Sequence, residues 1–189
     1  MALKWKKTDL PTLAQRKVDM ANETCQNTIY AGIDVELTTG TKHFSLSLED
    51  QQNINAKFQE VTLGATECQY KEDGGDMVIY PAEDIVTIYA AARMFIDRQL
   101  AYCSYLKKWI KRETDKNVLA GIAYGDDLPE DLDVGMDAVL ASSTAQLEKI
   151  VAAVNDGAFV DKIASLEAQM TDTQMGLCEV YELALGGAL

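Results

Sequence analysis

The chain has 189 residues, a mass of 20.8 kDa and a formal net charge of −13. Hydrophobic residues make up 48% of it and charged residues 25%, which are proportions of a globular protein and exclude a wholly disordered chain. The negative charge repels phosphate backbones, so we expect no nucleic-acid partner. No apolar run approaches the roughly 18 residues that span a bilayer, so we expect no membrane partner either.

The first helix is expected to begin near Leu10-Pro11, because proline is well tolerated at the first helical position. Apolar residues follow at roughly helical spacing, and Gly32 is expected to end the helix. These apolar residues are Leu13, Val18, Ala21, Cys25 and Ile29.

Residues 33–37 and 43–48 each alternate between apolar and polar side chains, as two strands with one buried face do. The register that keeps apolar residues opposite each other needs a loop of two or four residues centred on Thr39-Gly40. Threonine resists the positive φ of a two-residue type I′ turn. We therefore expect the four-residue loop Thr38–Thr41.

This register would place Val35 opposite Phe44 on the core face and Glu36 opposite His43 on the outer face. His43 is the only histidine, and Ser45 follows on the same face of the strand. With Glu36 opposite, this places a serine, a histidine and a carboxylate near one another, as in a catalytic triad. However, no nucleophile elbow surrounds Ser45, and a flat exposed sheet face offers no oxyanion hole. We expect a cross-strand Glu36–His43 pair, no catalytic residues and no enzyme activity.

Ser47 and Asp50 form a variant of the capping box, which predicts a helix from there to about Leu63. The strands of a second hairpin are expected at Glu67–Lys71 and Asp76–Tyr80. Because an isolated hairpin is marginal in water, we expect the two hairpins to form one small antiparallel sheet covered by helices.

The longest helix is expected from Pro81 to about Thr114. Four cations lie near its C-terminal end, where the helix dipole favours positive charge: Lys107, Lys108, Lys111 and Arg112. These cations either complement the dipole or bind the acidic C-terminal segment of another subunit, and the sequence leaves both interpretations open.

The last third of the chain is acidic and has a wholly helical pattern, which predicts a globular α+β domain at 1–125 and a helical region at 126–189. Short helices are expected at Leu132–Leu140 and Ser143–Val154, followed by a break at Asn155–Gly157.

From residue 159 onwards, apolar residues recur at alternating spacings of four and three, the heptad pattern of a coiled coil. The candidate oligomer-interface residues are Phe159, Ile163, Leu166, Met170, Leu177 and Val180. We expect this helix to form a homo-oligomer such as a trimer. The alternative is an amphipathic helix that packs on the globular part of its own chain.

The four cysteines Cys25, Cys68, Cys103 and Cys178 are far apart in the sequence, whereas zinc sites usually draw ligands from close pairs. The acidic residues between Asp126 and Asp133 lack the spacing of an EF-hand. We therefore expect reduced thiols, no metal and no cofactor.

Several segments between about residues 10 and 130 carry a family resemblance. They are Cys25, Ile29–Val35, His43–Leu46, Asp50–Ile54, Tyr70–Asp73, Tyr102–Ile110, Ile122–Gly125 and Leu128-Pro129. Together they resemble an uncharacterised family of tail-module proteins that tailed bacteriophages and prophages encode beside tail-fibre and baseplate genes. The motifs are structural and bring no catalytic residues with them.

The resemblance implies a structural component of a phage tail, at the tail tip, the baseplate or the fibre attachment. Its partners would be other tail proteins and copies of itself. Its location would be the virion, and the host cytoplasm during assembly. The alternative is a tail-fibre assembly chaperone that is not retained in the virion. The expected fold is α+β, with two hairpins in a small sheet, one long helix and a C-terminal coiled-coil-like extension.

Overall fold

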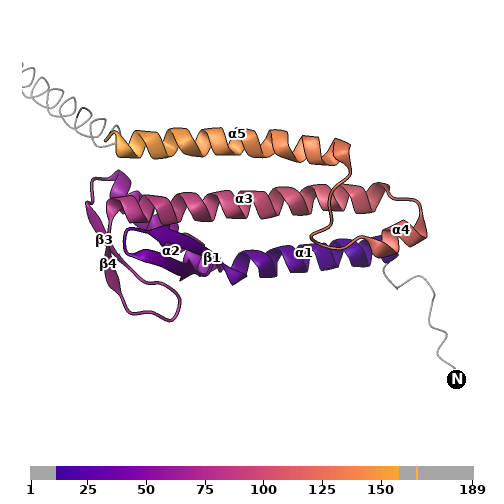
Figure 1. Ribbon diagram of the computed structural model, residues 1–189, viewed down its shortest axis with the longest axis horizontal. Coiled ribbons are helices and arrows are strands. Elements are labelled where there is room, and N and C mark those ends of the chain that lie inside the picture. Colours follow the sequence, from indigo (N-terminus) through magenta and orange to yellow (C-terminus); the bar gives the residue numbers. More distant parts are fainter. Residues whose placement is uncertain (1–11, 158–164, 166–189) are drawn as a thin grey trace, which may run out of the picture.

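The computed structural model describes residues 12–157 and Ser165 (Figure 1). The expected α+β class is confirmed, since helices accompany two antiparallel hairpins in this part of the chain. In chain order the elements are α1 (Leu13–Ala31), β1 (Ile33–Leu37), β2 (Gly40–Phe44), α2 (Leu48–Thr62), β3 (Glu67–Tyr70), β4 (Val78–Pro81), α3 (Ala82–Arg112), α4 (Lys116–Gly121) and α5 (Glu130–Asn155). No helix among the described residues is long and apolar enough to cross a membrane.

Helix α3 lies in the middle of the fold, and α1, α2 and α5 all pack against it (Figure 1). It has 31 residues and begins directly after Pro81, close to the predicted start. Buried side chains recur along it at helical spacing: Ile85, Ile88, Ala92, Ile96, Cys103, Leu106 and Ile110. These side chains connect two hydrophobic clusters, one with the hairpins and α2 and the other with α1 and α4.

The two hairpins form separate two-stranded sheets, which differs from the single sheet expected from the sequence. One backbone hydrogen bond joins them, from the Asp73 amide to the His43 carbonyl oxygen at 3.0 Å. The Lys42 ammonium also binds the Glu72 carboxylate at 2.9 Å, and aromatic side chains from both hairpins pack together. The ring of Phe44 lies 5.9 Å from that of Tyr70 and 6.4 Å from that of Tyr80, centre to centre. These ring contacts pack the two hairpins against each other without a shared ladder.

The predicted register of the first hairpin is wrong by two residues. Ile33, rather than Val35, lies opposite Phe44, and Asp34, rather than Glu36, lies opposite His43. The second strand also ends at Phe44 instead of residue 48. Because the shift is an even number of residues, Val35, Leu37 and Phe44 still face the core, whereas Leu48 begins α2 and is 63% exposed. Gly40 has a φ of +103°, so it takes the left-handed conformation that threonine would resist.

A buried carboxylate fixes the position of this turn. Asp84, in the first turn of α3, is 2% exposed. It accepts hydrogen bonds from the Thr38 amide at 3.0 Å and from the Thr38 hydroxyl at 2.7 Å. Alternation within the strands carries no information about this contact, because its partners are 46 residues apart. The register therefore depends on where α3 places Asp84.

The helix boundaries largely follow local signals. The capping box at α2 is confirmed, with Ser47 and Asp50 each binding the other's backbone amide. Helix α1 begins at Leu13 after the cap residue Thr12, slightly later than predicted. Its end is sterically fixed, because Gly32 has a φ of +87° and a Cβ there would lie 2.2 Å from the carbonyl oxygen of Phe44.

Helix α5 is continuous from Glu130 to Asn155, whereas two shorter helices were expected. Contacts with α3 support this helix near its start and in its middle, where serine and threonine have weak helix propensity. The Ser143 hydroxyl donates to the Asp97 carboxylate at 2.5 Å, and the Tyr105 hydroxyl donates to the Gly135 carbonyl at 2.8 Å. The predicted break after Asn155 is confirmed, and the expected domain boundary falls in the loop between α4 and α5.

Replacing the buried carboxylate should destabilise the protein, because both hydrogen bonds from Thr38 would be lost. We expect Asp84→Ala to lower the free energy of unfolding by about 2–3 kcal/mol, measured by urea denaturation. The matched control is Glu83→Ala, which removes an exposed carboxylate from the same helical turn and should cost less than about 1 kcal/mol. Equal losses in the two variants would contradict the assigned role of Asp84.

Candidate interaction groove

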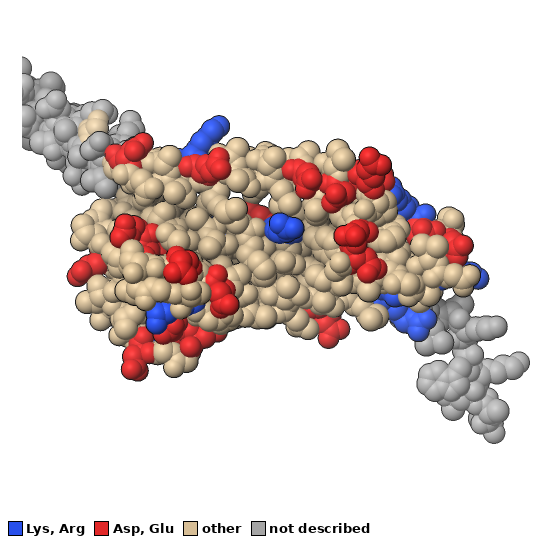
Figure 2. Space-filling model, viewed as in Figure 1, with Lys and Arg blue, Asp and Glu red and all other residues tan. Residues whose placement is uncertain are grey.

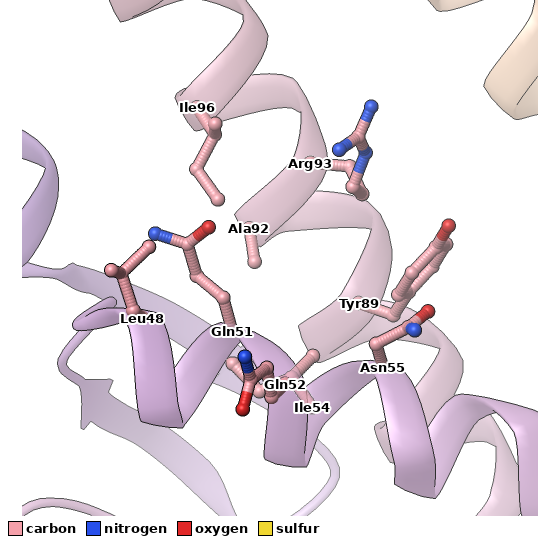
Figure 3. Close-up of a pocket in the computed structure, with 9 residues that line it drawn as sticks. All are labelled: Leu48, Gln51, Gln52, Ile54, Asn55, Tyr89, Ala92, Arg93 and Ile96. Carbon is pink, nitrogen blue, oxygen red and sulfur yellow. The ribbon is translucent and has the colours of Figure 1, made fainter.

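Two adjoining cavities lie along α3. The first, of about 380 Å³, lies between α2 and α3 (Figure 3). The second, of about 350 Å³, lies between α1 and α3. Both cavities are lined by Leu48, Gln51 and Ile96, so they adjoin and form one depression along α3 that these three side chains divide. We call this depression the α3 groove.

A strip of residues on α3 forms one wall of the groove. Its members line one or both cavities and are Tyr89, Arg93, Ile96, Leu100, Cys103 and Lys107. They follow one another at spacings of four, three, four, three and four residues. That spacing keeps them on one side of the helix, so they form a continuous α3 strip about 27 Å long.

The opposite wall comes from the first turns of α2 and from α1. The capping box holds the start of α2 in place, and the Gln51 side-chain amide donates to the Leu46 carbonyl oxygen at 2.8 Å. Gln51 reaches from α2 towards Ala92 and Ile96 of α3 (Figure 3). On the side of the second cavity, Tyr30 and Gln26 of α1 complete the lining.

Two leucines of the groove are poorly covered. Leu48 is 63% exposed and Leu100 is 53% exposed, although each lies beside buried apolar residues. Exposed apolar groups inside a depression favour a partner that removes them from water. The groove therefore has the chemistry of a surface that binds an apolar side of another polypeptide segment.

Cationic side chains lie towards both ends of the α3 strip. Arg93 forms an ion pair with Asp97 at 3.2 Å, and Lys107 donates to the Asn22 side-chain oxygen at 2.8 Å. Elsewhere the surface is mainly acidic, and Figure 2 shows acidic side chains scattered along the body of the molecule. The groove is thus less acidic than its surroundings.

The predicted basic cluster is divided among contacts within the chain. Arg112 binds Asp131 at 2.8 Å, and the Lys108 ammonium lies 3.6 Å from the centre of the Tyr105 ring. Lys107 belongs to the α3 groove. Binding of this cluster to the C-terminal segment of another subunit stays a prediction.

The Cys103 thiol beside the groove stays in its protonated form, which is a poor nucleophile. Cys25 and Cys103 line the second cavity, and both are buried and unpaired. Burial, together with the neighbouring Cys25, raises the pKa of Cys103 to about 11, so the thiol is protonated at neutral pH. Among the described residues, no cluster of three or more His, Cys, Asp or Glu side chains could hold a metal ion.

His43 and Ser45 take part in separate contacts. The Nδ1 atom of His43 lies 2.7 Å from the Asp34 carboxylate, and Nε2 lies 2.9 Å from the Ala31 carbonyl oxygen. The Ser45 hydroxyl lies within hydrogen-bond distance of the Asp50 and Asp73 carboxylates. The expected Glu36–His43 pair is wrong, because the register shift gives His43 a different acidic partner.

The charged form of His43 is favoured, since both ring nitrogens face acceptors. The hydrogen bond to Asp34, with a smaller contribution from the Ala31 carbonyl, raises the pKa of His43 above its usual 6.5. An imidazolium that donates from both nitrogens ties β2 to β1 and to the end of α1. This arrangement is a structural clamp.

The predicted oligomer-interface residues, Phe159, Ile163, Leu166, Met170, Leu177 and Val180, lie outside the described residues. The sequence interpretation missed the groove itself. In the sequence, apolar residues form a stripe along the predicted long helix, and Leu100 lies at the margin of this stripe. The position of Leu100 is the one feature of the sequence that indicates the groove. That this margin stays uncovered depends on how α1, α2 and α5 are placed.

Residues 12–124 match the model of a protein family described as "Domain of unknown function (DUF4376)". No curated protein and no solved structure matches the chain. All residues that line the α3 groove fall within the matched stretch, whereas α5 follows it.

The His43 clamp should make stability depend on pH. A raised pKa in the folded state adds stability that is fully present below about pH 6.5 and is lost as the pH rises through the folded-state pKa. We expect the wild type to lose up to about 1 kcal/mol between pH 6 and pH 9 relative to His43→Gln, because the pair is exposed.

NMR titration of the His43 ring should give a pKa above 6.5, and Asp34→Asn should bring it back towards that value. Urea denaturation of the wild type and of His43→Gln at both pH values measures the effect on stability. A His43 pKa at or below 6.5 in the wild type would contradict the clamp.

Proposed function

This chain belongs to the DUF4376 family, and from the resemblance of its segments to phage tail-module proteins we propose that it is a structural component of a bacteriophage tail, at the tail tip, the baseplate or the fibre attachment. It acts by binding other polypeptides and involves no chemical reaction. Its partners are other tail proteins and copies of itself. It is located in the virion, and in the host cytoplasm during assembly.

The observation that carries the proposal is the α3 groove with its half-exposed leucines. Leu48 and Leu100 lie on opposite walls of a depression between helices, beside buried Ile96. Grooves of this kind bind the apolar side of an amphipathic helix, and anchors at i, i+3, i+4 and i+7 fit residues spaced like the α3 strip. A helical segment is the partner that this geometry suits, and the resemblance to tail-module proteins is the reason for proposing that it belongs to a tail protein.

Two further observations support the proposal. Segments that resemble phage tail-module proteins include Tyr102–Ile110, which contributes Cys103 and Lys107 to the groove. In addition, residues 159–184 have the heptad pattern of a helix that packs against other helices. Both observations suit a protein that acts through its surfaces.

A tail-fibre assembly chaperone is the second candidate. The same groove would hold a helix of an immature fibre protein and release it later. A net charge of −13 suits a chain that must stay soluble while free in the host cell.

The copy number of the chain in purified virions separates the two candidates. Quantitative mass spectrometry should find it at a stoichiometric ratio to the tail proteins if it is a structural component. Its absence from virions, together with its presence on partly assembled tails or fibres, would support the chaperone instead. Absence from both would contradict both candidates.

A further inference from the structure

We propose that Cys25 of α1 and Cys103 of α3 form a reversible disulfide that joins the two helices beside the α3 groove. The observation that carries this inference is that each thiol contacts the helical turn that ends at the other cysteine, and that both thiols line one cavity. The inference goes beyond the proposed function, and the chemistry of the bond does not depend on that function.

The contacts of the two thiols are reciprocal. The Cys25 Sγ lies 3.4 Å from the carbonyl oxygen of Gln99, and the Cys103 Sγ lies 3.6 Å from the carbonyl oxygen of Ala21. Gln99 and Ala21 each lie four residues, about one helical turn, before the cysteine of their own helix. Each sulfur is therefore packed against the turn that ends at the other cysteine.

The alignment of the two helices keeps the cysteines at the same level. About one turn further along, the Lys107 ammonium donates to the Asn22 side-chain oxygen at 2.8 Å, so α1 and α3 run antiparallel. Facing positions on packed helices come close enough for a disulfide, whose Cα atoms are about 4.4–6.8 Å apart. The bond can thus form across the existing contact between α1 and α3.

The two thiols border a cavity that a small oxidant can enter. Both cysteines line the second cavity of the α3 groove, which has a volume of about 350 Å³. The exposed side chains of Leu48 and Leu100 line the same cavity, so it is open to solvent. A reagent in this cavity would reach both sulfurs without unfolding either helix.

The proposed step is thiol–disulfide exchange with a low-molecular-weight disulfide. One protein thiolate attacks a sulfur of the reagent, which releases one small thiol and leaves a mixed disulfide on the protein. The second protein thiolate then attacks the protein-bound sulfur of this mixed disulfide and releases the second small thiol. In total, two protein thiols are oxidised, one reagent disulfide is reduced, and two protons pass from the protein to the leaving groups.

The pH and the compartment control this reaction. Burial, together with the adjacent Cys25, raises the pKa of Cys103 to about 11, so its thiolate is scarce at neutral pH and the bond forms slowly there. In the location proposed above, the pair would be reduced in the host cytoplasm and oxidised in released virions. This setting, unlike the bond itself, rests on the proposed function.

Oxidation of the folded, full-length protein tests the inference. The reagent is 2-hydroxyethyl disulfide, a small disulfide, used at about pH 9 to raise the thiolate fraction. Trypsin digestion without a reductant should then give residues 18–42 linked to residues 99–107. Mass spectrometry should find this product about 2 Da below the summed masses of the two peptides, and dithiothreitol should separate them.

Single variants show which thiols are joined. Cys25→Ala and Cys103→Ala should each abolish the linked product. The matched control is Cys68→Ala, which should leave it unchanged. Cys68 is 3% exposed, but it lies on β3, its Sγ is 3.8 Å from the Lys57 carbonyl oxygen, and it lines neither cavity of the groove.

The bond should also stabilise the fold. It closes a loop of about 80 residues, which removes chain entropy from the unfolded state. We expect the Tm of the oxidised wild type to lie about 5–15 °C above that of the reduced protein. The same treatment should not raise the Tm of Cys25→Ala. The linked peptide in the wild type decides the inference even if an alanine variant fails to fold.

Three outcomes would overturn the inference. Cys25 and Cys103 stay free thiols after oxidation, or they keep the small reagent as stable mixed disulfides. The third is a linked product that appears only after the protein is unfolded in urea. Each outcome would show that the folded chain does not hold the two sulfurs within bonding distance. None of them bears on the presence of the chain in virions, which tests the proposed function separately.

Discussion

The packing of three helices and two hairpins on one long helix is the constraint on which this structure depends. Helix α3 contributes buried side chains to both hydrophobic clusters, from Ile85 near its start to Ile110 near its end. Its first turn also carries Asp84, which positions the turn of the first hairpin. Because a single rigid rod connects these contacts, the hairpins at one end and α4 at the other are held at a fixed separation.

Much of this fold could be predicted from local sequence signals. The Ser47–Asp50 capping box, the first strand and the break after Asn155 each depend on neighbouring residues, and each was found where it was predicted. The second strand was found at Gly40–Phe44 instead of residues 43–48. Three details depended instead on contacts between distant residues. They are the hairpin register set by Asp84, the packing of two separate hairpins through aromatic rings and the continuity of α5 across Ser143. The spacing of apolar and polar residues within one segment carries no information about such contacts.

The α3 groove could not be predicted from local sequence signals either. The spacing of Ile96, Leu100 and Cys103 could be read from the sequence, but it is equally typical of a helix buried on all sides. Only the placement of α1, α2 and α5 shows that the margin at Leu100 is left open to solvent. Interaction surfaces of this kind have no motif of their own, because they use the same residues and periodicity as a hydrophobic core.

The junction at Gly32 limits which sequences can adopt this fold. The backbone there combines a left-handed conformation with an approach of 2.2 Å between the missing Cβ and the Phe44 carbonyl oxygen, and neither condition can be relaxed by moving a side chain. Gly40 shares the positive φ but has open space around it. In a saturation-mutagenesis library, position 32 would therefore accept glycine alone, whereas position 40 would also admit asparagine or aspartate.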